Sequence, residues 1–103
     1  MFYNLNKEFL TSIYNTRIHC YKGSNTILIH KDQKVQGTTD EKFPYLLESL
    51  IQDYSDTKII VLTGTGYRDS ALDWVERITG SLGIKLFYSI EEANRYLRGK
   101  EIE

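Results

Sequence analysis

The segment with the most suggestive chemistry is Thr63-Gly64-Thr65-Gly66-Tyr67-Arg68-Asp69-Ser70, which follows an aliphatic run and leads into an amphipathic stretch. Free backbone amides at a helix N-terminus attract anions. The two glycines and the threonine between them, together with Arg68, therefore form a candidate anion- or nucleotide-binding loop. The loop lacks the third glycine of a dinucleotide fingerprint and the Gly-Lys-Ser/Thr of a phosphate loop. A tight turn followed by a helix cap is the alternative interpretation.

Other nucleophiles and metal ligands are sparse. The single cysteine, Cys20, begins a Cys-x-x-Gly-x-x-Thr pattern that resembles the phosphate loop of sugar-transport phosphocarrier subunits. β-type residues follow where that loop needs a helix, so we predict a packed strand residue. His19 and His30 are expected on adjacent strands, and without a third ligand at a suitable spacing we predict no metal site. His30, near Asp32, is interpreted as a strand-end histidine in contact with solvent, and we predict no cofactor.

The elements that would position these residues are clearest in the second half of the chain. Helical spacing of apolar residues predicts a helix over 41–54 that begins near Lys42 or Phe43, with Pro44 in its first turn. Lys58–Leu62 is typical of a central parallel strand buried on both faces. A helix over Ser70–Leu82 follows. The expected inward residues of the two helices are Phe43, Leu46, Leu47, Leu50, Ile51 and Tyr54, then Ala71, Leu72, Val75, Ile78 and Leu82.

Helix ends can be read from local signals. Asp69 or Ser70 is a suitable N-cap for the second helix, and Gly83 can end it in a left-handed conformation. Ile84–Tyr88 predicts a short strand. Ser89-Ile90-Glu91-Glu92 is a capping box for a final helix over Ile90–Arg98, which we expect to stop at Gly99.

The first part of the chain predicts a hairpin. Arg17–Lys22 and Thr26–Lys31 flank a Gly23-Ser24-Asn25 turn, whereas residues 1–15 fit either a helix or a strand. The predicted order is (α)ββαβαβα. It indicates one α/β domain over residues 1–103, with a small mixed sheet, helices covering it and an uncertain N-terminal extension.

Composition narrows the function classes. The chain has 103 residues, a net charge of −1 and a pI near 6.1, and we see no cluster of lysine and arginine. These features predict no nucleic-acid partner. No apolar run is long enough to span a bilayer, which predicts no membrane insertion. A single cysteine and the lack of a signal peptide favour a cytoplasmic location.

Residues 16–98 resemble the STAS-type domains, the family of anti-sigma-factor antagonists and their relatives. The resemblance rests on the hairpin followed by Gly37 and a helix, and on the ending Ile84-Lys85-Leu86-Phe87-Tyr88-Ser89-Ile90-Glu91-Glu92-Ala93-Asn94-Arg95-Tyr96-Leu97. It implies a non-enzymatic regulatory domain that binds another, unidentified protein. A homodimer is expected through a sheet edge if residues 1–15 form an exposed strand.

The same resemblance gives Asp69-Ser70 a role. In the antagonist branch, a phosphorylated serine or threonine follows an aspartate at a helix N-terminus, so Ser70 is the candidate phospho-acceptor. A phosphate there would repel a partner through its added negative charge. A second alignment makes Ser70 only a helix cap. The alternative function is a small anion- or nucleotide-binding domain that uses the Gly64–Gly66 loop.

Overall fold

The structure, a computed structural model, describes residues 1–13, 16–33 and 43–102. These residues form five strands and three helices: β1 (Asn6–Ile13), β2 (Thr16–Lys22), β3 (Thr26–Gln33), α1 (Phe43–Gln52), β4 (Thr57–Gly64), α2 (Asp69–Leu82), β5 (Lys85–Phe87) and α3 (Ile90–Ile102). The α/β class with a small mixed sheet is therefore confirmed. The predicted positions at 37 and 40–42 lie outside the described residues.

The strands form one sheet in the order β1-β2-β3-β4-β5. The predicted hairpin is present: β2 and β3 are antiparallel, and the amide of Gly23 donates to the carbonyl of Thr26 across the turn. β4 is parallel to both β3 and β5, because helices connect these strands. Ile59, Ile60 and Val61 are fully buried, as expected for a central parallel strand.

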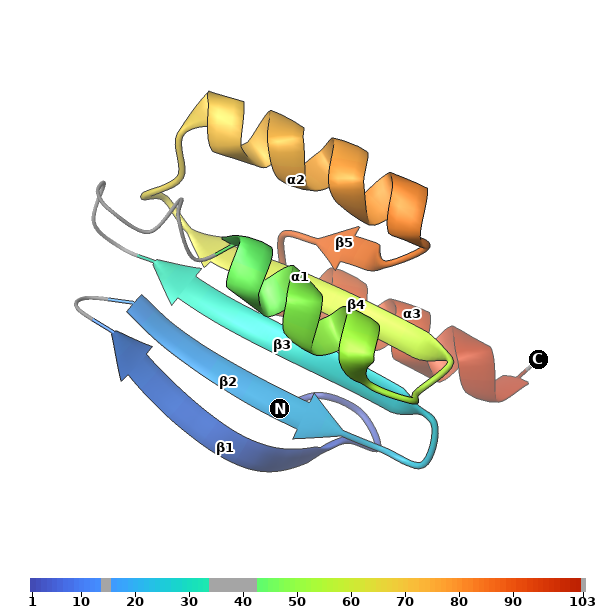
Figure 1. Ribbon diagram of the computed structural model, residues 1–103. Helices are drawn as coiled ribbons and strands as arrows, with labels where there is room; N and C mark the ends of the chain where they lie inside the picture. Colours follow the sequence, from blue (N-terminus) through green and yellow to red (C-terminus); the bar gives the residue numbers. More distant parts are fainter. Residues whose placement is uncertain (14–15, 34–42, 103) are drawn as a thin grey trace.

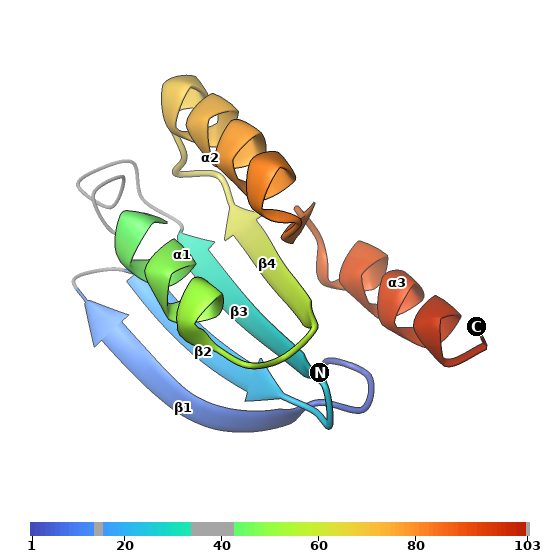
Figure 2. The ribbon, with the colours of Figure 1, turned by 45° about the vertical axis from the view of Figure 1, so that its right-hand side comes forward.

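Helices cover both faces of the sheet (Figures 1 and 2). Helices α1 and α2 lie on one face, and α3 lies on the other. Side chains alternate along β3, so Ile27 and Ile29 pack toward α1 and α2, whereas Leu28 packs toward α3. The same alternation determines which polar side chains of β3 share a face of the sheet.

Residues 6–13, which fitted either a helix or a strand, form the edge strand β1. It pairs with β2 only, and its register shifts between Lys7 and Phe9. Apolar residues at helical spacing did not produce a helix here because pairing with the β2–β3 hairpin overrides the local pattern.

Helix α1 is shorter than predicted. Ile51 is half exposed and Tyr54 is fully exposed, so neither belongs to the buried stripe. The Lys58 side-chain amine donates to the Ile51 carbonyl at 3.1 Å and so satisfies a carbonyl near the helix end.

Helix α2 differs from the expectation at its start. Its N-cap is Arg68, with no side-chain capping bond, and Asp69 and Ser70 are already helical. Leu82 is exposed. Thr79 is buried instead, and its hydroxyl donates to the Val75 carbonyl. The left-handed C-cap predicted at Gly83 is confirmed.

Helix α3 runs past Gly99 to Ile102, so the predicted stop was wrong. An isolated glycine weakens a helix by only about 1 kcal/mol and need not end it. One bond of the capping box forms, from the Glu92 amide to the Ser89 hydroxyl. The reciprocal bond does not appear in the described part of the chain. None of the described helices is long and apolar enough to cross a membrane.

Candidate functional site

The loop after β4 is tied to the end of β3. The amides of Thr65 and Gly66 both donate to the Gln33 carbonyl, at 3.1 and 3.3 Å. Gly64 has a φ of 101°, and a Cβ placed on it would lie 2.0 Å from the same carbonyl oxygen. Two of the three amides proposed for anion binding are therefore used inside the protein, while Arg68 is exposed beside them.

Asp69 and Ser70 both lie in the first turn of α2 and both are exposed. Neither side chain makes a hydrogen bond or ion pair to another described residue. The Asp69 carboxylate and the Ser70 hydroxyl therefore lie at the surface. No interaction between described residues connects these two side chains to the polar groups of the sheet.

A polar network spans the ends of β3 and β4 on the α3 face of the sheet. Asp32 and Thr63 are directly paired across the two strands, and the Thr63 hydroxyl donates to Asp32 Oδ1 at 2.9 Å. The same hydroxyl oxygen lies 2.8 Å from His30 Nε2. A hydroxyl has one proton. Because the Thr63 hydroxyl gives this proton to Asp32, the hydrogen shared between Thr63 and His30 must be carried by His30 Nε2.

This arrangement disfavours the protonated form of the His30 ring. With Nε2 protonated, the lone pair of the neutral ring is on Nδ1, which is buried without a hydrogen-bond partner among the described residues. Burial lowers the pKa of His30, the charge of Asp32 opposes this shift and His19 adds to it. The interpretation of His30 as solvent-contacting was wrong, since only 6% of the residue is exposed.

Aromatic rings also pack against His30. The rings of His30 and His19 are stacked with centroids 5.9 Å apart, and Phe2 contacts His30 edge-on at 5.6 Å. Residues near the N-terminus therefore pack directly behind the network. Asp32 and Thr63 remain half-buried, so they are the members of the network that a solute can reach.

The opposite face of the same strand end carries a second polar group of residues. Lys31 is fully buried, and its amine donates to Gln33 Oε1 at 3.0 Å and lies 5.0 Å from the centre of the Tyr67 ring. The Gln33 side chain donates to the Gly66 carbonyl, and the Tyr67 hydroxyl donates to the Lys31 carbonyl. These bonds fix the loop after β4 against β3, and burial raises the pKa of Tyr67.

The remaining candidates do not form a site. Cys20 is a buried free thiol, and burial raises its pKa, so the prediction of a packed strand residue is confirmed. Within residues 1–13, 16–33 and 43–102, no three histidine, cysteine, aspartate or glutamate side chains are grouped to hold a metal ion. Sequence reasoning placed His30 and Asp32 together but missed Thr63, which joins them from a strand 31 residues further along.

The sequence matches the family model of the PD-(D/E)XK nuclease superfamily domain over residues 9–95. No curated protein and no solved structure shows a significant match. The family match covers most of the chain and overturns the resemblance to STAS-type domains. It also overturns the expectation of a non-enzymatic regulatory domain and its alternative. The ending that carried the resemblance, a strand, a polar cap and a helix, is common to many α/β folds.

Proposed function

We propose, because the chain belongs to the PD-(D/E)XK nuclease superfamily, that it hydrolyses phosphodiester bonds of nucleic acid at the end of β3. Charge alone predicted no nucleic-acid partner, since the net charge is −1. Net charge reports on long-range attraction and not on the chemistry of a site. The family match therefore has more weight than composition in choosing the substrate.

The family is named after a sequence motif, and this chain contains only part of that motif. There is no Pro-Asp pair, since the single proline, Pro44, precedes Tyr45. The pattern of an acid, any residue and a lysine occurs three times, at Asp32-Gln33-Lys34, Asp40-Glu41-Lys42 and Asp56-Thr57-Lys58. The second of these lies outside the described residues.

The contacts of the other two tripeptides favour the first. Asp56 exchanges two hydrogen bonds with Asn25, and Lys58 donates to a helix carbonyl, so both termini of the third tripeptide have structural roles. Asp32 is half-buried at a strand end, and an ordered hydroxyl fixes one of its carboxylate oxygens. This placement of Asp32 is the observation that carries the proposal.

The chemistry assigns a role to each group. The Asp32 carboxylate takes a proton from the attacking water while the water oxygen bonds to phosphorus. The ester P–O bond breaks at the same time, and the leaving oxygen is protonated from solvent. Thr63 and His30 position the carboxylate through the hydrogen-bond chain described above. Lys34, assigned from the sequence alone, supplies positive charge for the phosphate oxygens.

Nucleases are among the enzymes that use paired metal ions. In the network of Asp32, Thr63 and His30, Asp32 is the single carboxylate, and the described residues offer no group of three or more ligands. They do not fit a metal centre of that kind. The roles proposed here accordingly belong to the chain's own side chains.

The test is cleavage of end-labelled DNA and RNA, single- and double-stranded, in buffers with Mg²⁺ or with a chelator. We expect the wild-type chain to cleave at least one substrate and Asp32→Asn to lower its rate by about 100-fold or more, as for loss of a general base. Asp73→Asn, which removes one exposed carboxylate on α2, should cleave at the wild-type rate.

The Asp56→Asn variant shows which of the two described tripeptides supplies the catalytic carboxylate. It should retain cleavage if Asp32 is the catalytic carboxylate. Loss of cleavage in Asp56→Asn with retention in Asp32→Asn would move the reaction centre to the other end of β4. A wild-type chain that cleaves none of the substrates in either buffer contradicts the proposal.

A further inference from the structure

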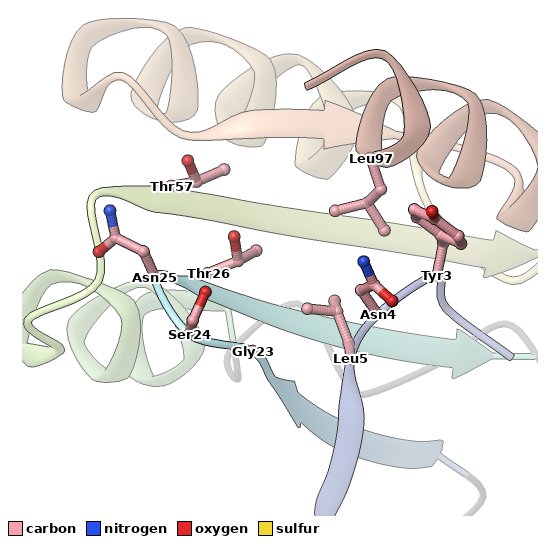
Figure 3. A pocket seen from close by; sticks show the side chains of 9 residues that line it. All are labelled: Tyr3, Asn4, Leu5, Gly23, Ser24, Asn25, Thr26, Thr57 and Leu97. Atoms are coloured by element: carbon pink, nitrogen blue, oxygen red, sulfur yellow. The ribbon is translucent and has the colours of Figure 1, made fainter. Parts of the chain in front are cut away.

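An uncharged pocket lies at the opposite end of the same face of the sheet. Its volume is about 280 Å³, and Thr26 and Thr57, at the starts of β3 and β4, lie at its floor. Figure 3 shows the Gly23–Asn25 turn on one side of it and Tyr3 with Leu97 of α3 on the other. Because side chains alternate along a strand, Thr26 and Thr57 share the face that carries Asp32 and Thr63.

The pocket lining suits a small neutral group with polar edges. None of the residues that line it carries a formal charge. Thr26 and Ser24 each bring a hydroxyl that is not engaged by another described side chain, and a hydroxyl can both donate and accept. Tyr3 and Leu97 add apolar walls. The volume is at the small end of ligand sites, which suits one nucleoside better than a longer unit.

Arg98 is connected to the pocket through Tyr3, which lines it; Arg98 itself lines a neighbouring hollow with Glu91, Asn94 and Arg95. The guanidinium of Arg98 lies 5.5 Å from the centre of the Tyr3 ring, and the Tyr3 amide is itself held by Asn94. Arg98 is exposed and forms no ion pair within the described part of the chain. Stacking on a ring restricts a long side chain in advance, and a guanidinium binds phosphate oxygens in a bidentate manner.

From these observations we infer that the pocket and Arg98 together bind one nucleotide of the substrate strand, with the nucleoside in the pocket and its phosphate on Arg98. The choice of a nucleotide rests on the proposed nuclease function, whereas the pocket and the stacked arginine are features of the fold. No residue of this site belongs to the reaction centre at Asp32.

The distance between the two sites sets the length of substrate that can occupy both. Thr26 and Asp32 are six residues apart on one strand, or about 20 Å at about 3.3 Å per residue. A nucleic-acid strand that rises about 3.4 Å per nucleotide covers this distance with about six nucleotides. A strand that keeps the rise of a duplex therefore contacts both sites only if it has about six nucleotides or more.

The first experiment measures binding with no cleavable bond present. The full chain, in a chelating buffer, is titrated with each of four nucleoside 5′-monophosphates, with the four nucleosides and with inorganic phosphate, while backbone amide resonances are recorded by NMR. We expect at least one monophosphate to shift the amides of Thr26 and Thr57. The matching nucleoside should bind roughly 10-fold more weakly, because a charge-assisted hydrogen bond is lost.

Two arginines of α3 provide a matched pair. Arg98→Gln should weaken the monophosphate roughly 10-fold and leave the nucleoside unchanged, whereas Arg95→Gln should change neither, since Arg95 does not stack on Tyr3. Thr26→Val should weaken the nucleoside. The inference is overturned if no monophosphate binds, if inorganic phosphate binds as tightly as the monophosphates, or if Arg95→Gln weakens binding as much as Arg98→Gln.

This result is independent of cleavage, so binding with no cleavage would contradict only the proposed function. If the chain does cleave, Arg98→Gln should raise KM for oligonucleotides longer than about six nucleotides and leave KM for dinucleotides unchanged. A KM raised equally for both lengths would count against the two-site arrangement.

Discussion

At the scale of single residues, the most informative group is His30. Its ring is held between the Thr63 hydroxyl and the rings of Phe2 and His19, and its second nitrogen has no polar partner among the described residues. A second proton on this ring would place an unsatisfied N–H in the protein interior, which costs free energy. The network therefore makes the stability of the folded state depend on pH.

We predict that the free energy of unfolding falls as the pH drops below 6.5. Burial lowers the pKa of His30 beneath its ordinary 6.5, so the unfolded chain binds a proton more readily than the folded chain. The part of the stability that depends on neutral His30 is therefore fully present above pH 6.5 and is lost as the pH falls toward the lowered pKa. Chemical unfolding at pH 7.5, 6.5 and 5.5 measures the effect.

His30→Gln, which keeps a donor for Thr63, should remove this fall, whereas His19→Gln should keep most of it. The Asp53 carboxylate affects stability in a different, lower pH range. Burial alone would raise its pKa, but hydrogen bonds from Lys22 and Ser55 outweigh burial and lower the pKa to about 2. Its contribution is lost only below about pH 4. An unchanged slope between pH 7.5 and 5.5 in His30→Gln would contradict the assignment.

At the scale of elements, the junction between β4 and the loop after it depends on one glycine. Gly64 is the last residue of β4, and the Gln33 carbonyl opposite it accepts the next two amides of the loop. This close approach requires a residue without a side chain. The same junction places Thr63 beside Asp32, so the turn and the proposed reaction centre are mechanically linked.

Gly64→Ala should destabilise the protein by about 2–3 kcal/mol, because alanine adds a clash with the Gln33 carbonyl and a strained positive φ. Gly80→Ala is the matched control. Gly80 is exposed within α2, and a methyl group added there would have no neighbouring atom within 4 Å, so alanine should stabilise by up to about 1 kcal/mol. Thermal unfolding of both variants measures these changes. If Gly64→Ala is as stable as Gly80→Ala, the junction tolerates a side chain.

At the scale of the whole molecule, one side chain joins the two ends of the described chain. Asn94 of α3 accepts a hydrogen bond from the Tyr3 amide at 2.8 Å and donates one to the Met1 carbonyl at 2.9 Å. Its amide group therefore pairs with the backbone as a neighbouring strand would. Phe2, between these two residues, is buried against Tyr21 and His30.

Asn94→Ala should lower the free energy of unfolding by about 1–3 kcal/mol, because it leaves two backbone groups without these partners. The Tyr3 amide should then exchange its hydrogen faster. Asn94→Asp keeps the acceptor and should protect that amide, while Arg95→Ala, at an exposed neighbour, should stay within about 0.5 kcal/mol of wild type. Unchanged exchange at Tyr3 in Asn94→Ala would show that Phe2 alone holds this segment.

Local patterns predicted the elements whose own sequence determines them. The aliphatic run around Ile60, the turn at Gly23 and the left-handed end at Gly83 all formed as predicted. β1 was ambiguous because the partner strand decides its conformation. The network around Asp32 was not foreseen, since Thr63 joins it only through the parallel pairing of β3 and β4. The reaction class came from the family match rather than from any motif recognised beforehand.

The bond between Tyr3 and Asn94 spans 91 positions of the chain. A ribosome adds about 5–20 residues per second, so the first residues wait roughly 5–20 s before their partner helix exists. During that interval Phe2 has no α3 beside it, and the apolar face of β2 and β3 stays open to water. Until α3 emerges, the apolar face of β2 and β3 can therefore associate with other chains.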